Sequence, residues 1–138
     1  QSDSLILKFQ SKSLNEILQN SDIISLHISG TEEIIGKKEL NLMKKSSILI
    51  NCARGGVVNE KDLVEILNNN NNNGLAYACL DCYINEPPLS SSSIDAAIYK
   101  HPLITTTPHI GAATFEAQDK VQTDLAHQII DFINQKYN

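Results

Sequence analysis

The sequence predicts an α/β fold in which strands and helices alternate and the strands form a mostly parallel sheet. Two observations support this prediction. Short apolar runs typical of strands alternate with segments whose apolar residues recur at helical spacing. One of these runs, Ser47–Cys52, is almost continuously apolar, as expected for a parallel strand covered on both faces. The same alternation is typical of βαβ units.

The first half of the chain contains the better marked helix starts. Ser13 and Glu16 form the Ser-x-x-Glu pattern of a capping box, and Asn59 is the predicted N-cap of a later helix. A short helix is predicted between these two helices, and its residues Leu40 and Met43 are expected to face inward. The expected elements, in order, are a strand at Leu5–Phe9, a helix at Ser13–Asn20, a strand at Ile23–Ile28, a helix at Lys37–Lys44, a strand at Ser47–Cys52 and a helix at Asn59–Asn68.

The second half contains two more strands and ends in a long helix. Leu75–Tyr83 and Leu103–Thr106 are the expected strands, with a turn of helix at Ile94–Tyr99 between them. Thr114–Lys136 carries apolar residues at helical spacing. At ~1.5 Å per residue, this helix would span about 34 Å, which is enough to cross from one lobe to another.

The composition is that of an ordinary globular chain. Of the 138 residues, 41% are hydrophobic and 20% are charged, which suits one domain or part of a larger one. The net charge of −5 and the lack of a basic stripe argue against nucleic acid as a partner. No apolar stretch approaches the roughly 20 residues of a membrane helix, so we expect no membrane partner. Three cysteines are an odd set for a disulfide framework and favour a reducing cytoplasm.

Cys79 and Cys82 form a Cys-x-x-Cys pattern. A redox or zinc site would place such a pair at a turn or helix start, or beside a second pair. Here the pair lies in a predicted buried strand, where residues three apart point to opposite faces. We therefore expect both cysteines to be structural. The four histidines show no metal-ligand spacing, and we expect no metal.

Three polar residues follow three of the predicted strands, where open α/β sheets carry their sites. Arg54 precedes two glycines, Glu86 precedes two prolines, and His109 follows a proline. An arginine can bind a carboxylate through two parallel hydrogen bonds. A histidine can move a proton near neutral pH, and a glutamate can hold that histidine in place. The three residues therefore suggest acid–base chemistry on a carboxylate substrate.

The motifs around these residues resemble those of the D-isomer-specific 2-hydroxyacid dehydrogenases. They are Asn-Cys-Ala-Arg-Gly-Gly at 51–56, Glu-Pro-Pro at 86–88 and Pro-His-Ile-Gly-Ala at 108–112, in the family's order and at family-like separations. Together with Glu-Ala-Gln at 116–118, they are most similar to the branch that oxidises 3-phosphoglycerate. The resemblance implies that Arg54 binds the substrate and polarises its carbonyl. It also implies that His109 is the general acid and base and that Glu86 orients His109.

The resemblance further implies NAD as the cofactor, with its nicotinamide half bound by these segments. Asp81 is expected to accept a hydrogen bond from the carboxamide, and the loop after His109 to close around the ring. A carboxylate in an apolar strand needs a partner, which supports the prediction for Asp81, although a structural buried acid is the alternative. Hydride transfer to nicotinamide needs no metal. The residues expected to contact the cofactor are Ile28, Cys52, Ala53, Arg54, Asp81, His109, Gly111 and Ala112.

None of the six glycines forms a Gly-x-Gly-x-x-Gly motif, the loop that cradles a pyrophosphate. In the resembled family this loop lies upstream. We therefore expect a partial Rossmann-like, doubly wound parallel sheet, with residues 1–112 as the later half of an NAD-binding domain. Residues 113–138 would cross to a substrate-binding domain mostly absent from this chain, which begins at Gln1 rather than Met. The choice between NAD and NADP stays open, and a homodimer or higher homo-oligomer is implied by the resemblance only.

The expected reaction is the NAD-dependent oxidation of a D-2-hydroxy acid, with 3-phosphoglycerate going to 3-phosphohydroxypyruvate in serine biosynthesis. A hydroxypyruvate, glyoxylate or D-lactate reductase is the first alternative. An NAD(H)-sensing binding module related to the transcriptional corepressors is the second, because such proteins keep the same three residues. The isolated 138 residues are expected to bind NADH weakly and to turn over no substrate.

Two departures from the family's pattern are visible. Cys82 and Tyr83 take the place of the usual Val-Phe pair, and Ser29-Gly30-Thr31 stands where the family has a longer, proline-containing loop. The run of asparagines at 68–73 and the run of serines at 90–93 are expected to be surface loops rather than binding tracts.

Overall fold

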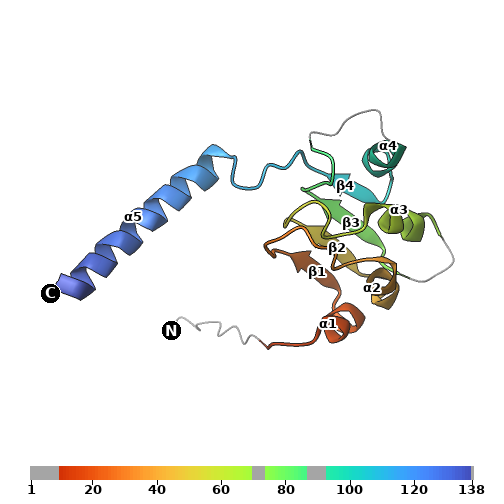
Figure 1. Ribbon diagram of the computed structural model, residues 1–138, viewed down its shortest axis with the longest axis horizontal. Coiled ribbons are helices and arrows are strands. Elements are labelled where there is room, and N and C mark those ends of the chain that lie inside the picture. Colours follow the sequence, from red (N-terminus) through yellow and green to blue (C-terminus); the bar gives the residue numbers. More distant parts are fainter. Residues whose placement is uncertain (1–9, 70–73, 87–92, 138) are drawn as a thin grey trace, which may run out of the picture.

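The computed structural model describes residues 10–69, 74–86 and 93–137. In this part of the chain, four strands form one parallel sheet in the order β1-β2-β3-β4 (Figure 1). The α/β class and the parallel sheet are therefore confirmed. The expected strand at 5–9, most of the asparagine run and most of the serine run lie outside the described residues. The strands are β1 at Ile23–Leu26, β2 at Ile48–Asn51, β3 at Tyr77–Leu80 and β4 at Ile104–Thr106.

Helices separate the strands, as the sequence predicts. Ser13 caps the first helix in a capping box with Glu16, and the Asn59 side chain accepts a hydrogen bond from the backbone N–H of Asp62 at 3.0 Å. The strands and helices begin and end within a few residues of the predicted bounds, and most of them are shorter than predicted. The helices are α1 at Leu14–Asn20, α2 at Lys37–Leu42, α3 at Glu60–Asn68, α4 at Ser93–Tyr99 and α5 at Phe115–Tyr137.

The core lies between the sheet and the helices packed on one of its faces (Figure 1). A buried row crosses the four strands in register: Ile24, Leu49, Ala78 and Ile104. Leu18 of α1, Leu40 of α2 and Leu63 of α3 are fully buried against this face. The sequence gives α1 an apolar face that includes Leu14 and Ile17, but both are more than a third exposed.

The opposite face of the sheet is only partly covered. Ile48 and Ile50 of β2 are half-buried, and Ile23 of β1 is exposed. The prediction that the Ser47–Cys52 strand is covered on both faces is therefore wrong for the described residues. The reason is that strands in sequential order receive their crossover helices on one face only.

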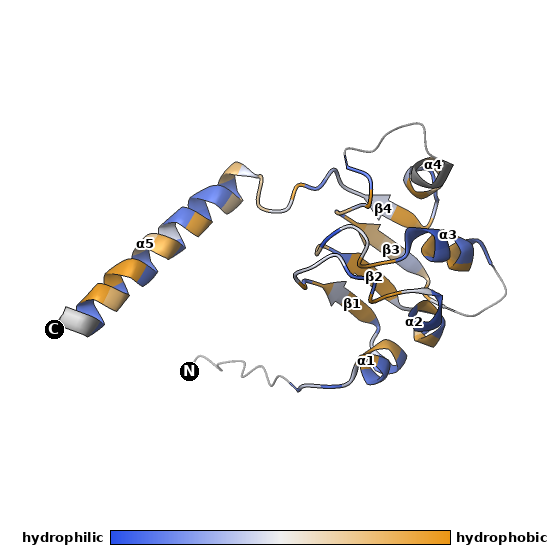
Figure 2. Ribbon diagram, in the orientation of Figure 1, coloured by the Kyte–Doolittle hydropathy of each residue, from blue (hydrophilic) through white to orange (hydrophobic). Residues whose placement is uncertain are grey.

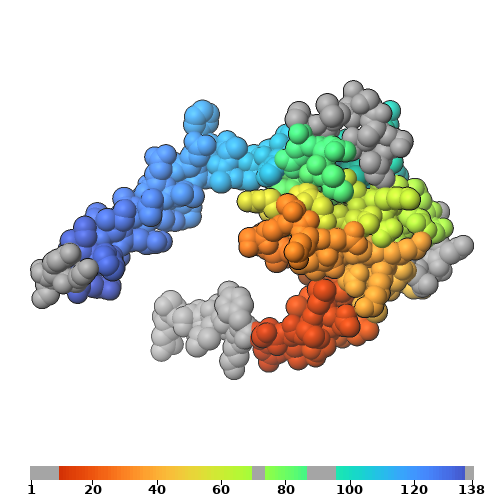
Figure 3. All heavy atoms as spheres, in the orientation of Figure 1, coloured from red at the N-terminus to blue at the C-terminus, as the bar shows by residue number. Residues whose placement is uncertain are grey.

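Helix α5 stands apart from the sheet (Figures 2 and 3). The side chains of 115–135 are exposed throughout, except for the half-buried Ala117. The helix alternates polar and apolar residues, and its large apolar side chains include Phe115, which is 91% exposed. The others are Val121, Leu125, Ile129, Ile130, Phe132 and Ile133. Among the described helices, none is both long and apolar enough to cross a membrane.

Candidate active site

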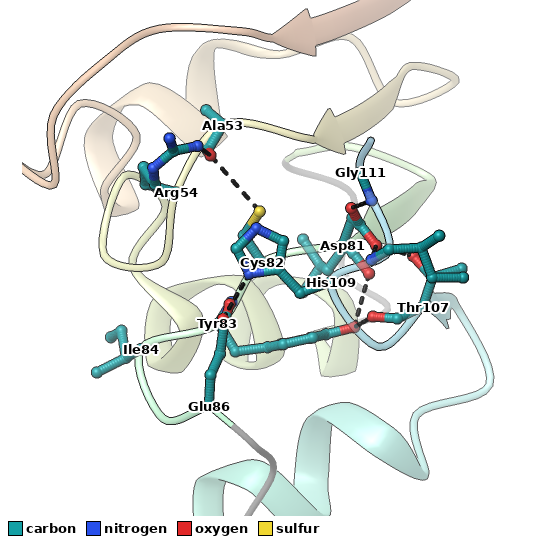
Figure 4. Close-up of polar contacts among 12 residues, drawn as sticks. Ala53, Arg54, Asp81, Cys82, Tyr83, Ile84, Glu86, Thr107, His109 and Gly111 are labelled. Atoms are coloured by element: carbon teal, nitrogen blue, oxygen red, sulfur yellow. Dashed lines mark hydrogen bonds and ion pairs between the residues drawn. The ribbon is translucent and has the colours of Figure 1, made fainter. Parts of the chain in front are cut away.

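The predicted site residues meet at the carboxyl ends of β2, β3 and β4. Arg54 follows β2, Asp81 and Glu86 follow β3, and His109 follows β4. Because the strands are parallel, these ends share one edge of the sheet. Figure 4 shows the side chains converging around Cys82.

The loop after β2 is fixed by hydrogen bonds to a buried side chain. Asn51, 2% exposed, accepts a hydrogen bond from the Ala53 N–H and donates one to the Arg54 carbonyl, both at 3.1 Å. The Arg54 guanidinium donates to the Ala53 carbonyl at 2.6 Å. Among the described residues it makes no other hydrogen bond, so most of its five N–H donors remain for a ligand.

Gly55 brings this loop against the segment that follows β3. A Cβ at position 55 would lie 1.8 Å from the backbone oxygen of Tyr83, a separation that no side chain allows. Glycine is therefore required here for close approach rather than for an unusual backbone angle. Arg54 sits beside the Glu86 segment because of this contact.

His109 and Glu86 form the predicted pair. The Nδ1 atom of His109 lies 2.5 Å from a carboxylate oxygen of Glu86, and the Tyr83 N–H donates to the other oxygen at 2.8 Å. The hydrogen bond from His109 lowers the pKa of Glu86, which keeps the carboxylate ionised near neutral pH. His109 has a φ of 50°, a left-handed backbone conformation that is strained for a residue with a Cβ.

Asp81 holds the loop that carries His109. One of its oxygens accepts from the Thr107 hydroxyl at 2.6 Å and from the Ile110 N–H at 2.9 Å, and the other accepts from the Gly111 N–H at 3.0 Å. Partial burial alone would raise the pKa of Asp81, but these three hydrogen bonds outweigh it and lower the pKa. The partner that a buried acid needs is therefore supplied within the chain. A carboxylate has about four lone-pair sites, so Asp81 can still accept one more hydrogen bond.

Two structural residues were not predicted from the sequence. The Tyr83 hydroxyl lies 2.7 Å from the carbonyl oxygens of both Leu80 and Thr107, which joins the ends of β3 and β4. Burial raises the pKa of this hydroxyl, so it stays a donor. Glu60, 4% exposed, accepts from the Ile84 N–H at 2.8 Å and fixes the start of the Glu86 segment. Only the departure from Val-Phe at 82–83 marked this region in the sequence.

Two of the remaining residues predicted to contact the cofactor line two separate hollows. Cys52 lines a small hollow with Asp81 and Thr107, next to the loop of His109. Ile28 lies instead in a separate hollow after β1, with Ser29 and Thr31. Ala53 is buried beneath the Arg54 loop, while Gly111 and Ala112 are exposed.

The cysteines are free thiols in different surroundings. Cys79 is half-buried in β3, whereas Cys82, just after β3, is 2% exposed and donates to the Ala53 carbonyl at 3.5 Å. No disulfide joins the three cysteines.

Residues 2–111 match the model of one protein family, described as "D-isomer specific 2-hydroxyacid dehydrogenase, NAD binding domain". The chain belongs to this family. Its match covers the four strands and the loops that carry Arg54, Glu86 and His109, so the resemblance found in the motifs is confirmed.

Relatives of this chain include enzymes with different named substrates. D-3-phosphoglycerate dehydrogenase from Bacillus subtilis is 38% identical over 125 residues, covering 88% of this chain and 22% of the relative. The structure of D-lactate dehydrogenase with NAD⁺ from Lactobacillus jensenii is 31% identical, with a TM-score of 0.68, covering 77% of this chain and 34% of that one. A glyoxylate reductase structure from Paecilomyes thermophila is 35% identical, with a TM-score of 0.67, and the match covers 81% of this chain and 33% of that one.

The family's cofactor is NAD, and the site agrees with the nicotinamide half of that group. The hollow beside Cys52 opens next to Asp81, which retains capacity for one donor such as an amide N–H. Gly111 adds no side chain there, and a Cβ at this position would lie 4.0 Å from an Asp81 oxygen. The chain spans 22% of the Bacillus subtilis relative, and its sequence contains no Gly-x-Gly-x-x-Gly loop for the pyrophosphate.

Proposed function

We propose that this chain carries the proton-transfer and substrate-binding residues of an NAD-dependent D-2-hydroxyacid dehydrogenase. The observation that supports this most is the His109–Glu86 contact of 2.5 Å at the carboxyl edge of a parallel sheet. A charge-assisted pair of this kind holds an imidazole in one orientation, as general acid–base chemistry needs. When bound, NAD would supply the hydride acceptor.

The pair determines which nitrogen of His109 can act on substrate. Glu86 is ionised, so it accepts the proton on Nδ1 and leaves the lone pair on Nε2. Nε2 would then take the hydroxyl proton during oxidation and return it during reduction. The imidazolium formed in this step faces the negative charge of Glu86, which stabilises it.

Arg54 would bind the substrate carboxylate. Its guanidinium now donates to the carbonyl of Ala53, the residue before it, so it would turn outward to bind a substrate. A planar guanidinium can then hold the carboxylate through two hydrogen bonds and place the hydroxyl carbon near His109.

We propose 3-phosphoglycerate as the substrate, which is supported by relatives named D-3-phosphoglycerate dehydrogenase that are 34% to 39% identical. The named activities of the solved neighbours make D-lactate and glyoxylate the alternatives. Among the site residues named above, Arg54 is the only one with a permanently cationic side chain, so we expect phosphate recognition to involve another lobe.

We propose further that residues 1–112 form the later half of the NAD-binding domain and that residues 113–138 cross to a substrate-binding lobe. The exposed apolar side chains of α5 support this arrangement, since such surfaces normally face another element. Pairing into a homodimer would follow the family, and the three free thiols agree with a reducing cytoplasm.

The test is NADH formation by the full-length gene product with 3-phosphoglycerate, D-lactate and D-glycerate. We expect turnover with 3-phosphoglycerate. Turnover only with an unphosphorylated acid would overturn the substrate and keep the reaction class. Tight NADH binding without turnover of any acid would contradict the enzyme and favour a sensing module.

A further inference from the structure

Cys82 is a polar group at the centre of the site that the proposed reaction does not use. Its Sγ, a carboxylate oxygen of Glu86 and a ring nitrogen of His109 all lie within 4.8 Å of one another. Figure 4 shows the Cys82 sulfur at the edge of the imidazole ring that faces Ala53, with Glu86 on the opposite side of the ring. Three different ligand types therefore converge from two separate loops.

Each of these groups is one that zinc prefers. Zn²⁺ binds thiolate, imidazole and carboxylate, at about 2.3 Å to sulfur and about 2.0–2.2 Å to nitrogen or oxygen. Tetrahedral ligands at such distances lie about 3.5 Å apart, so the 2.5 Å contact between His109 and Glu86 would open by about 1 Å. Both side chains are partly exposed, at 39% and 32%, and can make that movement, whereas Cys82 is fixed by packing.

The surroundings of the thiol leave it available to a cation. Its only described acceptor is the Ala53 carbonyl at 3.5 Å, a weak bond that a metal would replace easily. The carboxyl groups of Asp81 and Glu86 place negative charge near the sulfur atom.

We propose that Cys82, Glu86 and His109 form a binding site for Zn²⁺ or another thiophilic divalent cation, with water in the fourth position. The thiol would release its proton as the Cys82–metal bond forms. A neutral imidazole bound to the metal through either ring nitrogen carries its proton on the other, so His109 would have no free lone pair with which to accept a proton from a hydroxy acid. The site would act as an inhibitory one, and it shares two residues with the proposed function.

The direct test is a Co²⁺ titration of the 138-residue chain, in the absence of cofactor and substrate. Co²⁺ bound to a thiolate gives a charge-transfer band and the visible bands of a tetrahedral site. We expect both in the wild type and in Cys79→Ala, the matched variant of the half-buried cysteine three residues earlier, in β3. In Cys82→Ala the thiolate band should vanish, and the affinity for Co²⁺ and for competing Zn²⁺ should fall at least about tenfold.

Absence of a thiolate band in the wild type, or an unchanged band in Cys82→Ala, would overturn the proposal. If circular dichroism shows that Cys82→Ala is unfolded, His109→Ala decides instead, because that side chain is partly exposed. His109→Ala should also bind Co²⁺ at least about tenfold more weakly, and wild-type affinity would refute the site. These titrations measure binding without turnover, so their failure is distinct from failure of the proposed dehydrogenase function.

Discussion

Asp81 and Glu86 lie close together in the segment after β3, and both carboxyl groups have a pKa below the ordinary value. Their partners differ. Asp81 accepts from one hydroxyl and two backbone N–H groups, all of them neutral donors that belong to the loop of His109. Glu86 accepts from the imidazole of His109 itself, and from a single backbone N–H, that of Tyr83.

The difference between these partners separates a structural role from a catalytic one. A carboxylate that satisfies backbone N–H groups fixes the path of the chain, and its loss leaves those donors unpaired. A carboxylate that faces a partly exposed imidazole adds little to stability but controls where the proton sits. We therefore expect Asp81 to act through structure and Glu86 through chemistry.

The largest effect is expected for His109→Ala. Loss of the general base should reduce kcat of the full-length gene product by about 10²–10⁴-fold, without a change in its far-ultraviolet circular dichroism. Because Glu86 would act only through His109, the double variant His109→Ala/Glu86→Gln should be no slower than His109→Ala alone. A further loss in the double variant would show that Glu86 has a separate role.

The next largest effect is expected for Gly55→Ala, which tests the contact that joins the Arg54 loop to the Glu86 segment. The new Cβ would clash with the backbone of Tyr83. Urea unfolding should therefore show a free energy of unfolding that is lower by about 3 kcal/mol. Gly30→Ala is the control, because its Cβ meets nothing within 4 Å and only its φ of 104° is unfavourable. Its loss should be nearer 1 kcal/mol. Equal losses would indicate that the close approach is not maintained.

A smaller loss of stability is expected for Asp81→Asn. The amide has one acceptor oxygen in place of two and loses the negative charge, so some of the three donors stay unpaired. We expect a loss of about 2 kcal/mol, measured by urea unfolding of the 138-residue chain. A stability equal to that of the wild type would contradict the structural role of Asp81.

The smallest effect is expected in how folding stability depends on pH under acidic conditions. The folded-state pKa of Asp81 is below the unfolded-state value, so its ionised form stabilises the fold above the unfolded pKa. This contribution is lost as the pH falls through the folded pKa, below about 3.8. Unfolding midpoints of the wild type should therefore decrease more steeply than those of Asp81→Asn on acidification. Parallel curves for the two proteins would mean that another carboxylate dominates.

Local patterns accounted for most of the fold. The capping box at Ser13 and the N-cap at Asn59 were predicted correctly, because their partners lie three residues away. The open face of the sheet was not predicted, since the apolar residues Ile48 and Ile50 do not reveal which helices are available to cover them.

The site was predicted in its side chains but not in its backbone. The contact between Glu86 and His109 was expected from the motifs, and the structure contains it. Two of the three donors to Asp81 are the backbone N–H groups of Ile110 and Gly111, about 30 residues downstream. Backbone N–H groups are the same for nearly every residue type, so no sequence pattern marks them.

The most direct test of the division between the two carboxylates is to measure Glu86→Gln beside Asp81→Asn. Unfolding in urea and kcat would both be followed in the full-length gene product. We expect Glu86→Gln to keep the stability of the wild type within about 0.5 kcal/mol and to lose about 10²-fold in kcat. Stability lost to the same extent as in Asp81→Asn, or a kcat equal to that of the wild type, would contradict it.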